Sequence, residues 1–569
     1  MYVDFRVEIP NEVGKITRKT IKGTTYIYYQ TDRIYHSDKK YSQPKATTIG
    51  KMCEDDSSMM IPNDKYMIFF PEAALPEAKA ASSRSACLRV GTYMVIRKII
   101  AEYGLDTMLK EVLGGEEDLF LDLATYSIIA ESNAGQYYPD YAYNHPLFTE
   151  DMKIYSDSKV SSFINGIKKE QSVEFLNRWN KSVTHKNRIY ISYDSTNKNC
   201  QAGDIDLAEF GHAKDDKSKP IINYSVGYDR TNRIPLWYEA YPGSIVDISQ
   251  LHSTLQKVDG LGYKRIGFIL DRGYFSKENI HEMDRMGYDF IIMMMGKKAL
   301  VSDLVMEVKG IFEEDRRCSI RDYKVSGTTV KRQLYPSDEK ERYFHIYYNE
   351  SKRITEREHL EAKIDQLGEL LQEKQGTIGY ECPRAICEYF DPVYHTKGDA
   401  KTFVSARERT DVINREIALC GYFVIITSEK MTAEEALEEY KSRDVSEKLF
   451  RGDKSYLGNR SYRVHSTESV ENKIFIEFVA LIIRNKIYTS LKDQMRMNKK
   501  KDNYITVPAA IKELEKIEMI RLSDGNYRLE HAVTSTQKEI LKAFNLTGRN
   551  VQEQAIGINE ELRMIRERK

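Results

Sequence analysis

Two aspartates stand out because each directly follows a segment with the composition of a buried strand. Asp194 comes after Ile189–Tyr193, and Asp271 comes after the apolar run Arg265–Leu270. We expect both side chains to emerge at strand ends, where a rigid sheet can hold a carboxylate in place. Carboxylates that converge in this way can bind two Mg²⁺ ions and support phosphoryl transfer. An aspartate after a strand is also a common turn former or helix cap, and this alternative stays open for each.

A third carboxylate, Glu447, lies in a charged segment that is expected to be helical from Ala433 to about Phe450. At about 100° per residue, four polar side chains fall within an arc of roughly 60° on this helix: Tyr440, Arg443, Glu447 and Lys454. On this geometry Glu447 faces the metal ions, and the other three flank it and can bind nucleic-acid phosphates. An exposed charged helix with chance spacing explains the same pattern.

The sequence lacks residues that several other reactions and binding sites require. An aspartate-nucleophile phosphatase normally has a second aspartate two positions after the first, but Thr196 stands there. The chain contains no GxxxxGK[ST] segment, which argues against a P-loop nucleotide triphosphatase. The 7 cysteines are scattered, without a CxxC pair, and no zinc pattern appears. An odd number of scattered cysteines is typical of a protein in a reducing cytosol.

The overall charge is balanced, with 86 Lys+Arg and 86 Asp+Glu in 569 residues. Binding to nucleic acid must therefore depend on local basic stretches. The candidates are Lys15–Lys22, Lys181–Arg188, Arg316–Lys324 and Lys499–Lys501. Each could equally be a solvated charged surface. No signal peptide is recognisable, and no apolar run approaches the roughly 20 residues of a membrane span, so we expect a soluble, cytoplasmic protein.

The order of predicted elements indicates several domains. From residue 187 onward it reads strand, strand, strand, helix, strand, helix, strand, which suits a ribonuclease-H-like mixed α/β sheet. The expected divisions are a β-rich N-terminal module (1–75), a helical, DNA-binding region (76–186), the first part of the core (187–299), a β-rich insertion (300–425), the completion of the core (426–490) and a helical tail (491–569).

The three motifs together resemble a known family. Tyr-x2-Arg-x3-Glu-x6-Lys, met by residues 440–454, resembles the YREK motif of a large group of bacterial insertion-sequence DDE transposases. Tyr193–Thr196 and Phe268–Phe275 look like the first and second aspartate motifs of that group. The long gap between Asp271 and Glu447 resembles the subgroup with a β-rich insertion domain. The resemblance covers roughly residues 187–490 and rests on three motifs that occur in order.

The resemblance implies a function and partners. Asp194, Asp271 and Glu447 would be the catalytic acids and the ligands of two Mg²⁺ ions, with Mn²⁺ as a substitute. Such enzymes act as homodimers on double-stranded DNA, cut the terminal inverted repeats and paste the element into target DNA. Members that form a DNA hairpin use a tryptophan in the insertion. Here both tryptophans, Trp179 and Trp237, lie outside 300–425. Tyr343, Phe344 and Tyr347 are possible aromatic replacements.

Two other functions remain open. A transposase-derived repressor or architectural protein would bind DNA without cutting it. A nuclease with the same fold would cleave DNA without joining the ends. The presence of all three acids favours the transposase over the repressor.

Overall fold

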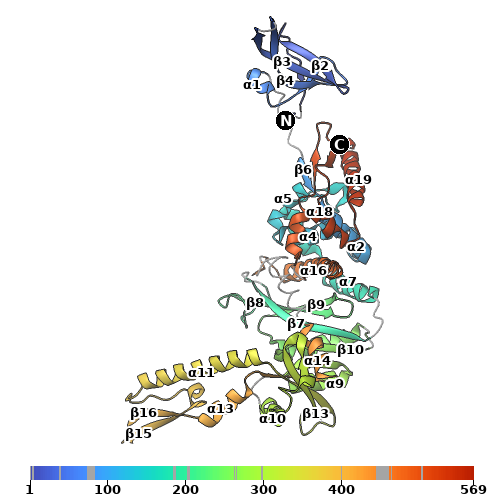
Figure 1. Cartoon of the computed structure of the whole chain (residues 1–569). Helices are drawn as coiled ribbons and strands as arrows, with labels where there is room; N and C mark the ends of the chain where they lie inside the picture. Colours follow the sequence, from blue (N-terminus) through green and yellow to red (C-terminus); the bar gives the residue numbers. More distant parts are fainter. Residues whose placement is uncertain are drawn as a thin grey trace. The chain divides into compact units, whose positions relative to one another are not determined.

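The structure is a computed structural model of the chain (Figure 1). It describes residues 2, 5–37, 40–73, 84–183, 188–200, 205–261, 263, 265–295, 299–398, 400–443, 461–462, 464, 466–501 and 504–568. The chain divides into two compact units. Unit 1 comprises residues 1–102, 136–157 and 490–569, and unit 2 comprises residues 103–135 and 158–489.

The N-terminal part of unit 1 is an antiparallel sheet with the strand order β1-β5-β4-β3-β2. Its elements are β1 Val7–Glu8, β2 Ile16–Ile21, β3 Thr24–His36, β4 Tyr41–Met52, β5 Met59–Pro62 and helix α1 Tyr66–Phe69. Ile27, Ile49 and Met60 pack with Tyr66 of α1 to form its core. Strand β3 is 13 residues long, and its second half is mostly exposed.

The rest of unit 1 joins residues from both ends of the chain. Its elements are β6 Cys87–Arg89, α2 Gly91–Tyr103, α5 Tyr138–Asn144, α17 Val507–Leu514, β19 Glu518–Arg521, β20 Tyr527–Leu529, α18 Ser535–Lys542 and α19 Gly548–Glu567. Strands β20, β19 and β6 form one small sheet. The segment 491–569, predicted as a helical tail, contains the helices α17, α18 and α19, but it also contains two short strands: β19 pairs with β6, and β20 pairs with β19.

A large mixed sheet organises unit 2, with the order β12-β13-β14-β17-β11-β10-β7-β8-β9. Its strands are β7 Ile189–Cys200, β8 Ile221–Asp229, β9 Ile234–Pro242, β10 Ile266–Leu270, β11 Asp289–Met293, β12 Ser319–Ile320, β13 Val325–Gln333, β14 Glu341–Tyr348 and β17 Tyr422–Thr427. Strands β7, β8 and β9 form an antiparallel meander. Strand β10 lies parallel to both β7 and β11. Short strand β18 (Ser461–Tyr462) pairs with the far end of β7.

Unit 2 also contains helices, some of which connect strands of this sheet. They are α3 Leu105–Leu113, α4 Glu117–Ala130, α6 Asp157–Gly166, α7 Lys169–Ser182, α8 Asp247–Gly260, α9 Lys277–Met286, α10 Ala299–Val308, α14 Ala433–Lys441 and α16 Thr467–Met497. Helix α16 is buried along most of its middle, where apolar residues such as Phe475 and Ile482 are inaccessible. Within the described part of the chain, no helix combines the length and apolar content that crossing a bilayer requires.

The segment 300–425, predicted as a β-rich insertion, divides between two structures. Strands β13 and β14 pair with each other, and β14 pairs with β17, so they extend the main sheet. The remainder contains the long helix α11 (Glu350–Glu373), α12 (Arg384–Cys387), the hairpin β15 (Phe390–Lys397) and β16 (Ala400–Glu408), and α13 (Thr410–Leu419). These elements pack around a core of their own, which includes Leu360, Phe390 and Phe403. Helix is therefore at least as prominent as strand in this segment.

Candidate active site

The sequence predicted Asp194 at the end of a strand, and this was wrong. Asp194 lies in the middle of β7. Strand β7 continues to Cys200, because the polar residues that follow Asp194 are buried and satisfied. The side-chain amide of Asn197 donates to the His212 carbonyl at 3.0 Å and accepts from the Lys214 N–H at 3.0 Å. Asn199 makes the equivalent pair of bonds with Asp216. A connecting loop thus keeps this polar half of the strand in the sheet.

Asp271 directly follows β10, as predicted. Its carboxylate accepts the Arg272 N–H at 2.7 Å and so caps the short 3-10 helix Arg272–Tyr274. Ile269 pairs in parallel register with Ser192 of β7. Continued by two residues, this register brings Asp271 beside Asp194. Asp271 therefore both caps the turn and lies beside Asp194.

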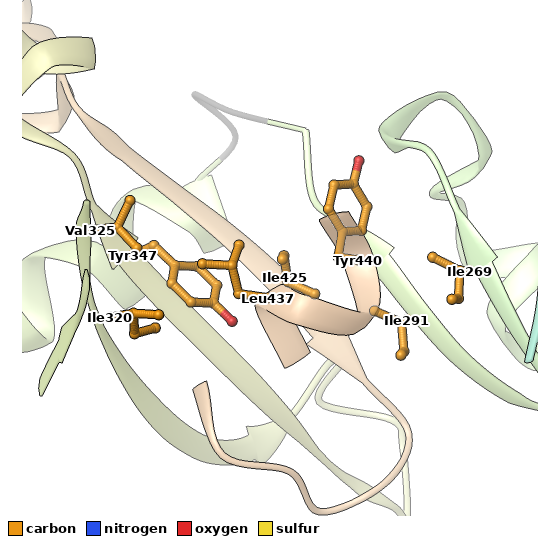
Figure 2. Packing of buried hydrophobic residues seen from close by; sticks show 8 residues of the cluster. All are labelled: Ile269, Ile291, Ile320, Val325, Tyr347, Ile425, Leu437 and Tyr440. Carbon is orange, nitrogen blue, oxygen red and sulfur yellow. The ribbon is translucent and has the colours of Figure 1, made fainter. Parts of the chain in front are cut away.

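Helix α14 brings the third motif onto this part of the sheet. Leu437 and Tyr440 of α14 belong to a buried apolar cluster with Ile269 and Ile291, residues of β10 and β11 (Figure 2). Burial of such side chains stabilises the contact by about 1.5–3 kcal/mol each. The ring of Tyr440 is held in this core, and its hydroxyl donates to Asp271 Oδ1 at 3.1 Å. Packing of α14 thus sets the position of a polar group at the site.

Arg443 joins the two aspartates. Its Nη1 lies 3.6 Å from Asp194 Oδ2, and its Nη2 lies 3.7 Å from Asp271 Oδ1. The Arg443 side chain is 12% exposed and that of Asp194 is 17% exposed, so the contact between them is largely shielded from water, whereas Asp271 is 37% exposed. The guanidinium carbon also lies 5.6 Å from the centre of the Tyr440 ring, within the range of a cation–π contact.

The helix that carries this motif is shorter than predicted. Helix α14 ends at Lys441 with Ser442 as its C-cap, so the helix predicted from Ala433 to about Phe450 is interrupted there and Arg443 lies in the turn that follows. Residues 444–450 lie outside the described residues. The arc predicted from helical spacing therefore does not describe how Arg443 reaches the site. The third predicted acid, Glu447, and the predicted phosphate ligand Lys454 lie outside the described residues.

The surroundings of Asp194 act on the pKa of its carboxyl in opposite directions. Burial raises the pKa of its carboxyl from an ordinary value of 3.8 to about 6, although the positive charges of Arg443 and Lys214 act in the opposite direction. The Ser195 N–H donates to Asp194 Oδ1 at 2.9 Å and favours the ionised form. Asp271, as a second negative charge, adds to the rise. A cation near both carboxylates relieves this repulsion, and Arg443 is such a cation.

The two carboxylates also fit a divalent metal ion by their chemistry. Mg²⁺ prefers carboxylate oxygens, usually from one or two side chains together with water and substrate phosphates. Asp194 and Asp271 supply such oxygens at one point, where a cationic group already lies between them. Among the described residues no group of three or more His, Cys, Asp or Glu side chains forms a complete metal site.

Sequence reasoning missed two features that support the aspartates. The Tyr274 hydroxyl donates to Ser195 Oγ at 2.8 Å, which connects the residue after Asp194 to the segment after Asp271. Lys214 Nζ donates to the Ser195 carbonyl at 2.8 Å. Tyr274 and Ser195 both lie within the recognised motifs, so their pairing could have been proposed. Nothing in the sequence marks Lys214, because it comes from a polar loop.

The aromatic residues that were considered as replacements for tryptophan have different settings. Phe344 and Tyr347 of β14 are fully buried in the sheet, whereas Tyr343 is only partly buried. Trp237 is buried in β9, and its ring lies over Gly227 of β8, where a Cβ atom would clash with it.

Comparison with protein families decides the classification. The family described as "Transposase DDE domain" matches residues 191–483, which is more than half of the chain. The chain belongs to this transposase family. The matched segment includes Asp194, Asp271, Tyr440 and Arg443, and the prediction that the chain is a DDE transposase is thereby confirmed.

Solved structures of transposases are also similar to this chain, although distantly. One is a piggyBac transposase synaptic complex with hairpin DNA, at 7% identity and a TM-score of 0.33, with 64% of this chain and 59% of that chain covered. Another is a Mos1 transposase paired-end complex with the left transposon end, at 10% identity and a TM-score of 0.14, with 42% and 68% covered. No curated protein matches the sequence.

Proposed function

We propose that the protein is a DDE transposase that cleaves transposon ends and joins them to target DNA by a cut-and-paste route. Asp194, Asp271 and Glu447 are the proposed catalytic acids and ligands of two Mg²⁺ ions, for which Mn²⁺ can substitute. The observation that carries the proposal is the convergence of Asp194 and Asp271, from adjacent parallel strands, on Tyr440 and Arg443 of the third motif. Family membership supports the same reading.

The finer classification rests on the sheet and the motif order. An antiparallel meander followed by two parallel strands agrees with the ribonuclease-H-like core inferred from the order of elements. The Tyr440 and Arg443 contacts support membership of the bacterial insertion-sequence group with the YREK motif. The long α11-containing segment between the second and third motifs is consistent with an insertion domain.

The residues at the site have distinct proposed roles. Metal ions, when bound, activate the attacking oxygen and stabilise the leaving oxygen. Asp194 and Asp271 hold their carboxylates in one place because a strand, a capped turn and the Tyr440 hydroxyl fix them. Arg443 offers a planar guanidinium that can bind a DNA phosphate through two parallel hydrogen bonds. Lys454 is proposed as a further phosphate ligand.

The proposed substrate is double-stranded DNA that carries terminal inverted repeats, together with target DNA. The proposed active form is a homodimer, since two transposon ends must be processed together. A cytoplasmic protein of a bacterium, associated with the nucleoid when bound to DNA, fits this role.

Substitution of Asp271 tests the assignment of the acids. We expect Asp271→Asn to abolish Mg²⁺-dependent cleavage of duplexes taken from both flanks of the gene and to leave DNA binding within about threefold, because the variant retains the shape and loses a ligand charge. Asp303→Asn is the matched control, since Asp303 is 62% exposed on α10 and its ion pair with Arg415 is worth little. Cleavage by Asp271→Asn at the wild-type rate would contradict the proposal.

The same substrates separate the other functions. Products in which a flank becomes covalently joined to a second duplex identify a transposase, and cleavage without joining identifies a nuclease. A gel shift without any cleavage in Mg²⁺ or Mn²⁺ identifies a DNA-binding repressor or architectural protein.

A further inference from the structure

The outer halves of β3 and β4 leave the N-terminal sheet as a two-stranded ribbon, formed by residues 31–36 and 41–46. Its pairing runs from Asp32 opposite Lys45 to His36 opposite Tyr41. The register shifts between Gln30 and Asp32, which marks a β-bulge where the ribbon leaves the sheet. Strand β2 pairs with β3 only up to Tyr29, so no third described strand lies beside the ribbon (Figure 1).

The ribbon is exposed on both faces. Ile34 is 50% exposed, Tyr35 66% and Tyr41 47%, and the core cluster of the sheet includes none of them. An isolated two-stranded hairpin is marginally stable in water, because it buries little apolar surface. Large side chains that stand exposed on such a ribbon point to a partner that covers them.

The charges of the ribbon favour an anionic partner. The described residues of the ribbon, together with Lys40 in the connecting turn, include three cationic residues and one carboxylate. The cationic residues are Arg33, Lys40 and Lys45, and the carboxylate is Asp32. The Asp32 carboxylate already accepts the Arg33 N–H at 2.7 Å. Thr31 Oγ1 donates to the Lys45 carbonyl at 3.1 Å, which ties the two strands together at the base.

Pairing with a second copy of the chain is opposed at the strand edges. Pro44 lies opposite Arg33 and has no N–H to offer to a further strand. On β2, which is one of the two edge strands of the sheet, Arg18 and Lys19 are exposed. Charged residues and proline on edge strands are the usual means by which proteins prevent edge-to-edge association. The faces of the ribbon remain the surfaces available for binding.

We propose that this ribbon inserts into the major groove of duplex DNA, an inference that rests on the proposed function and names the element that reads the transposon end. The major groove, about 12 Å wide, admits a two-stranded β-ribbon. Alternation along the strands places Ile34, Gln43 and Tyr41 on one face, and Tyr35 and Ser42 on the other.

The face that carries Gln43 is assigned to the base edges. A glutamine amide can donate and accept at once, as adenine recognition requires, and an aliphatic side chain such as Ile34 can contact a thymine methyl group. His36 Nε2 lies 3.1 Å from Gln43 Oε1, and the His36 ring stacks on Tyr41 at 5.2 Å, so this face is ordered before DNA is bound. The long side chains of Arg33 and Lys45 are assigned to the phosphates beside the groove.

Binding by the full chain, measured in EDTA so that no cleavage occurs, tests the proposal. The probes are short duplexes tiled across the DNA that flanks the gene. We expect Arg33→Ala combined with Lys45→Ala to weaken binding to the best duplex roughly tenfold and to reduce the slope of log K against log salt by about 1.8, since each phosphate contact contributes about 0.9. Lys65→Ala is the matched control, because Lys65 is an exposed cation of the same module outside the ribbon.

Gln43→Ala is the second variant, and it separates base contacts from phosphate contacts. We expect it to reduce the preference for the best duplex over unrelated duplexes about tenfold and to leave the salt slope unchanged, because a bidentate base contact contributes roughly 1–3 kcal/mol of discrimination. Unchanged affinity, preference and salt slope in these variants would overturn the ribbon assignment, whether or not the protein cleaves DNA.

Dissociation of a dimer by the same substitutions, with DNA affinity unchanged, would also overturn the assignment, because it would make the ribbon a contact between copies. Failure of the wild type to cleave, with the ribbon effects present, would instead refute only the proposed catalytic function.

Discussion

The buried carboxylate of Asp194 should reduce the stability of the protein at neutral pH, and Asp194→Asn should restore it. The rise in the pKa of Asp194 from 3.8 to about 6 corresponds to a cost of about 3 kcal/mol for the ionised form at pH 7. Well below pH 3.8 the carboxyl is protonated in both the folded and the unfolded chain, so the cost is absent, and at pH 4 it is still small. It grows as pH rises from about 4 to about 6, and it is constant above that range. The asparagine variant carries no charge and should lack this dependence.

Tryptophan fluorescence is a suitable probe of the unfolding of unit 2. Trp179 and Trp237 are the only tryptophans, both lie in unit 2, and their exposures are 1% and 5%. Urea titrations in EDTA, at a series of pH values between 4 and 7.5, give the free energy of unfolding of this unit. We expect the variant to match the wild type at pH 4 and to exceed it by roughly 1–3 kcal/mol at pH 7.

The comparison is decisive because the sign of the effect is unusual. Most substitutions of a buried residue destabilise a protein, whereas removal of an unfavourable charge from a functional site stabilises it. Asp303→Asn, at an exposed position, controls for the loss of one negative charge. The reasoning would be refuted if Asp194→Asn were as stable as the wild type, or less stable, at pH 7 while matching it at pH 4.

Two further predictions concern charges in unit 2. Arg443→Gln should raise the pKa of Asp194 above its wild-type value, because the guanidinium favours the ionised carboxylate. The midpoint of the pH-dependent loss of stability should therefore move to higher pH. An unchanged midpoint would contradict the contact between Arg443 and Asp194. Lys198→Met should lower the free energy of unfolding by about 3–5 kcal/mol, because it leaves the Glu477 carboxylate buried after loss of a 2.9 Å ion pair. Recovery of most of this loss in Lys198→Met/Glu477→Leu would confirm the cause, and a loss below about 1 kcal/mol in the single variant would contradict it.

The second motif was predictable because its signals are local. The apolar run before Asp271 forms β10, Ser276 caps α9 by accepting the Asn279 N–H, and Gly287 ends the helix with a positive φ of 72°. Each signal operates within a few residues, so the sequence around it contains all that is needed. The capping box that Thr432 and Glu435 form at the start of α14 is a local signal of the same kind.

The errors occurred where tertiary contacts decide the structure. The polar half of β7 resembles a turn until the loop at 212–216 supplies its hydrogen-bond partners. Ser162 and Ser172 are of a residue type that often starts a helix, but both lie inside helices and donate to the carbonyls of Ser158 and Lys169. A serine hydroxyl can serve either purpose, and only the position of the surrounding turn determines which.

The charge state of the site depends on opposing effects that come from both the strands and the segment that follows α14. Dehydration by the sheet disfavours a charged Asp194, while a backbone N–H and the Arg443 guanidinium favour it. With its pKa at about 6, Asp194 is roughly nine-tenths ionised at pH 7. Asp271 is fixed differently, by the Arg272 N–H and the hydroxyl of Tyr440, both of which donate to one oxygen. The apolar packing of α14 on β10 and β11 therefore delivers the groups that allow two carboxylates to stay close together and available to a cation at neutral pH.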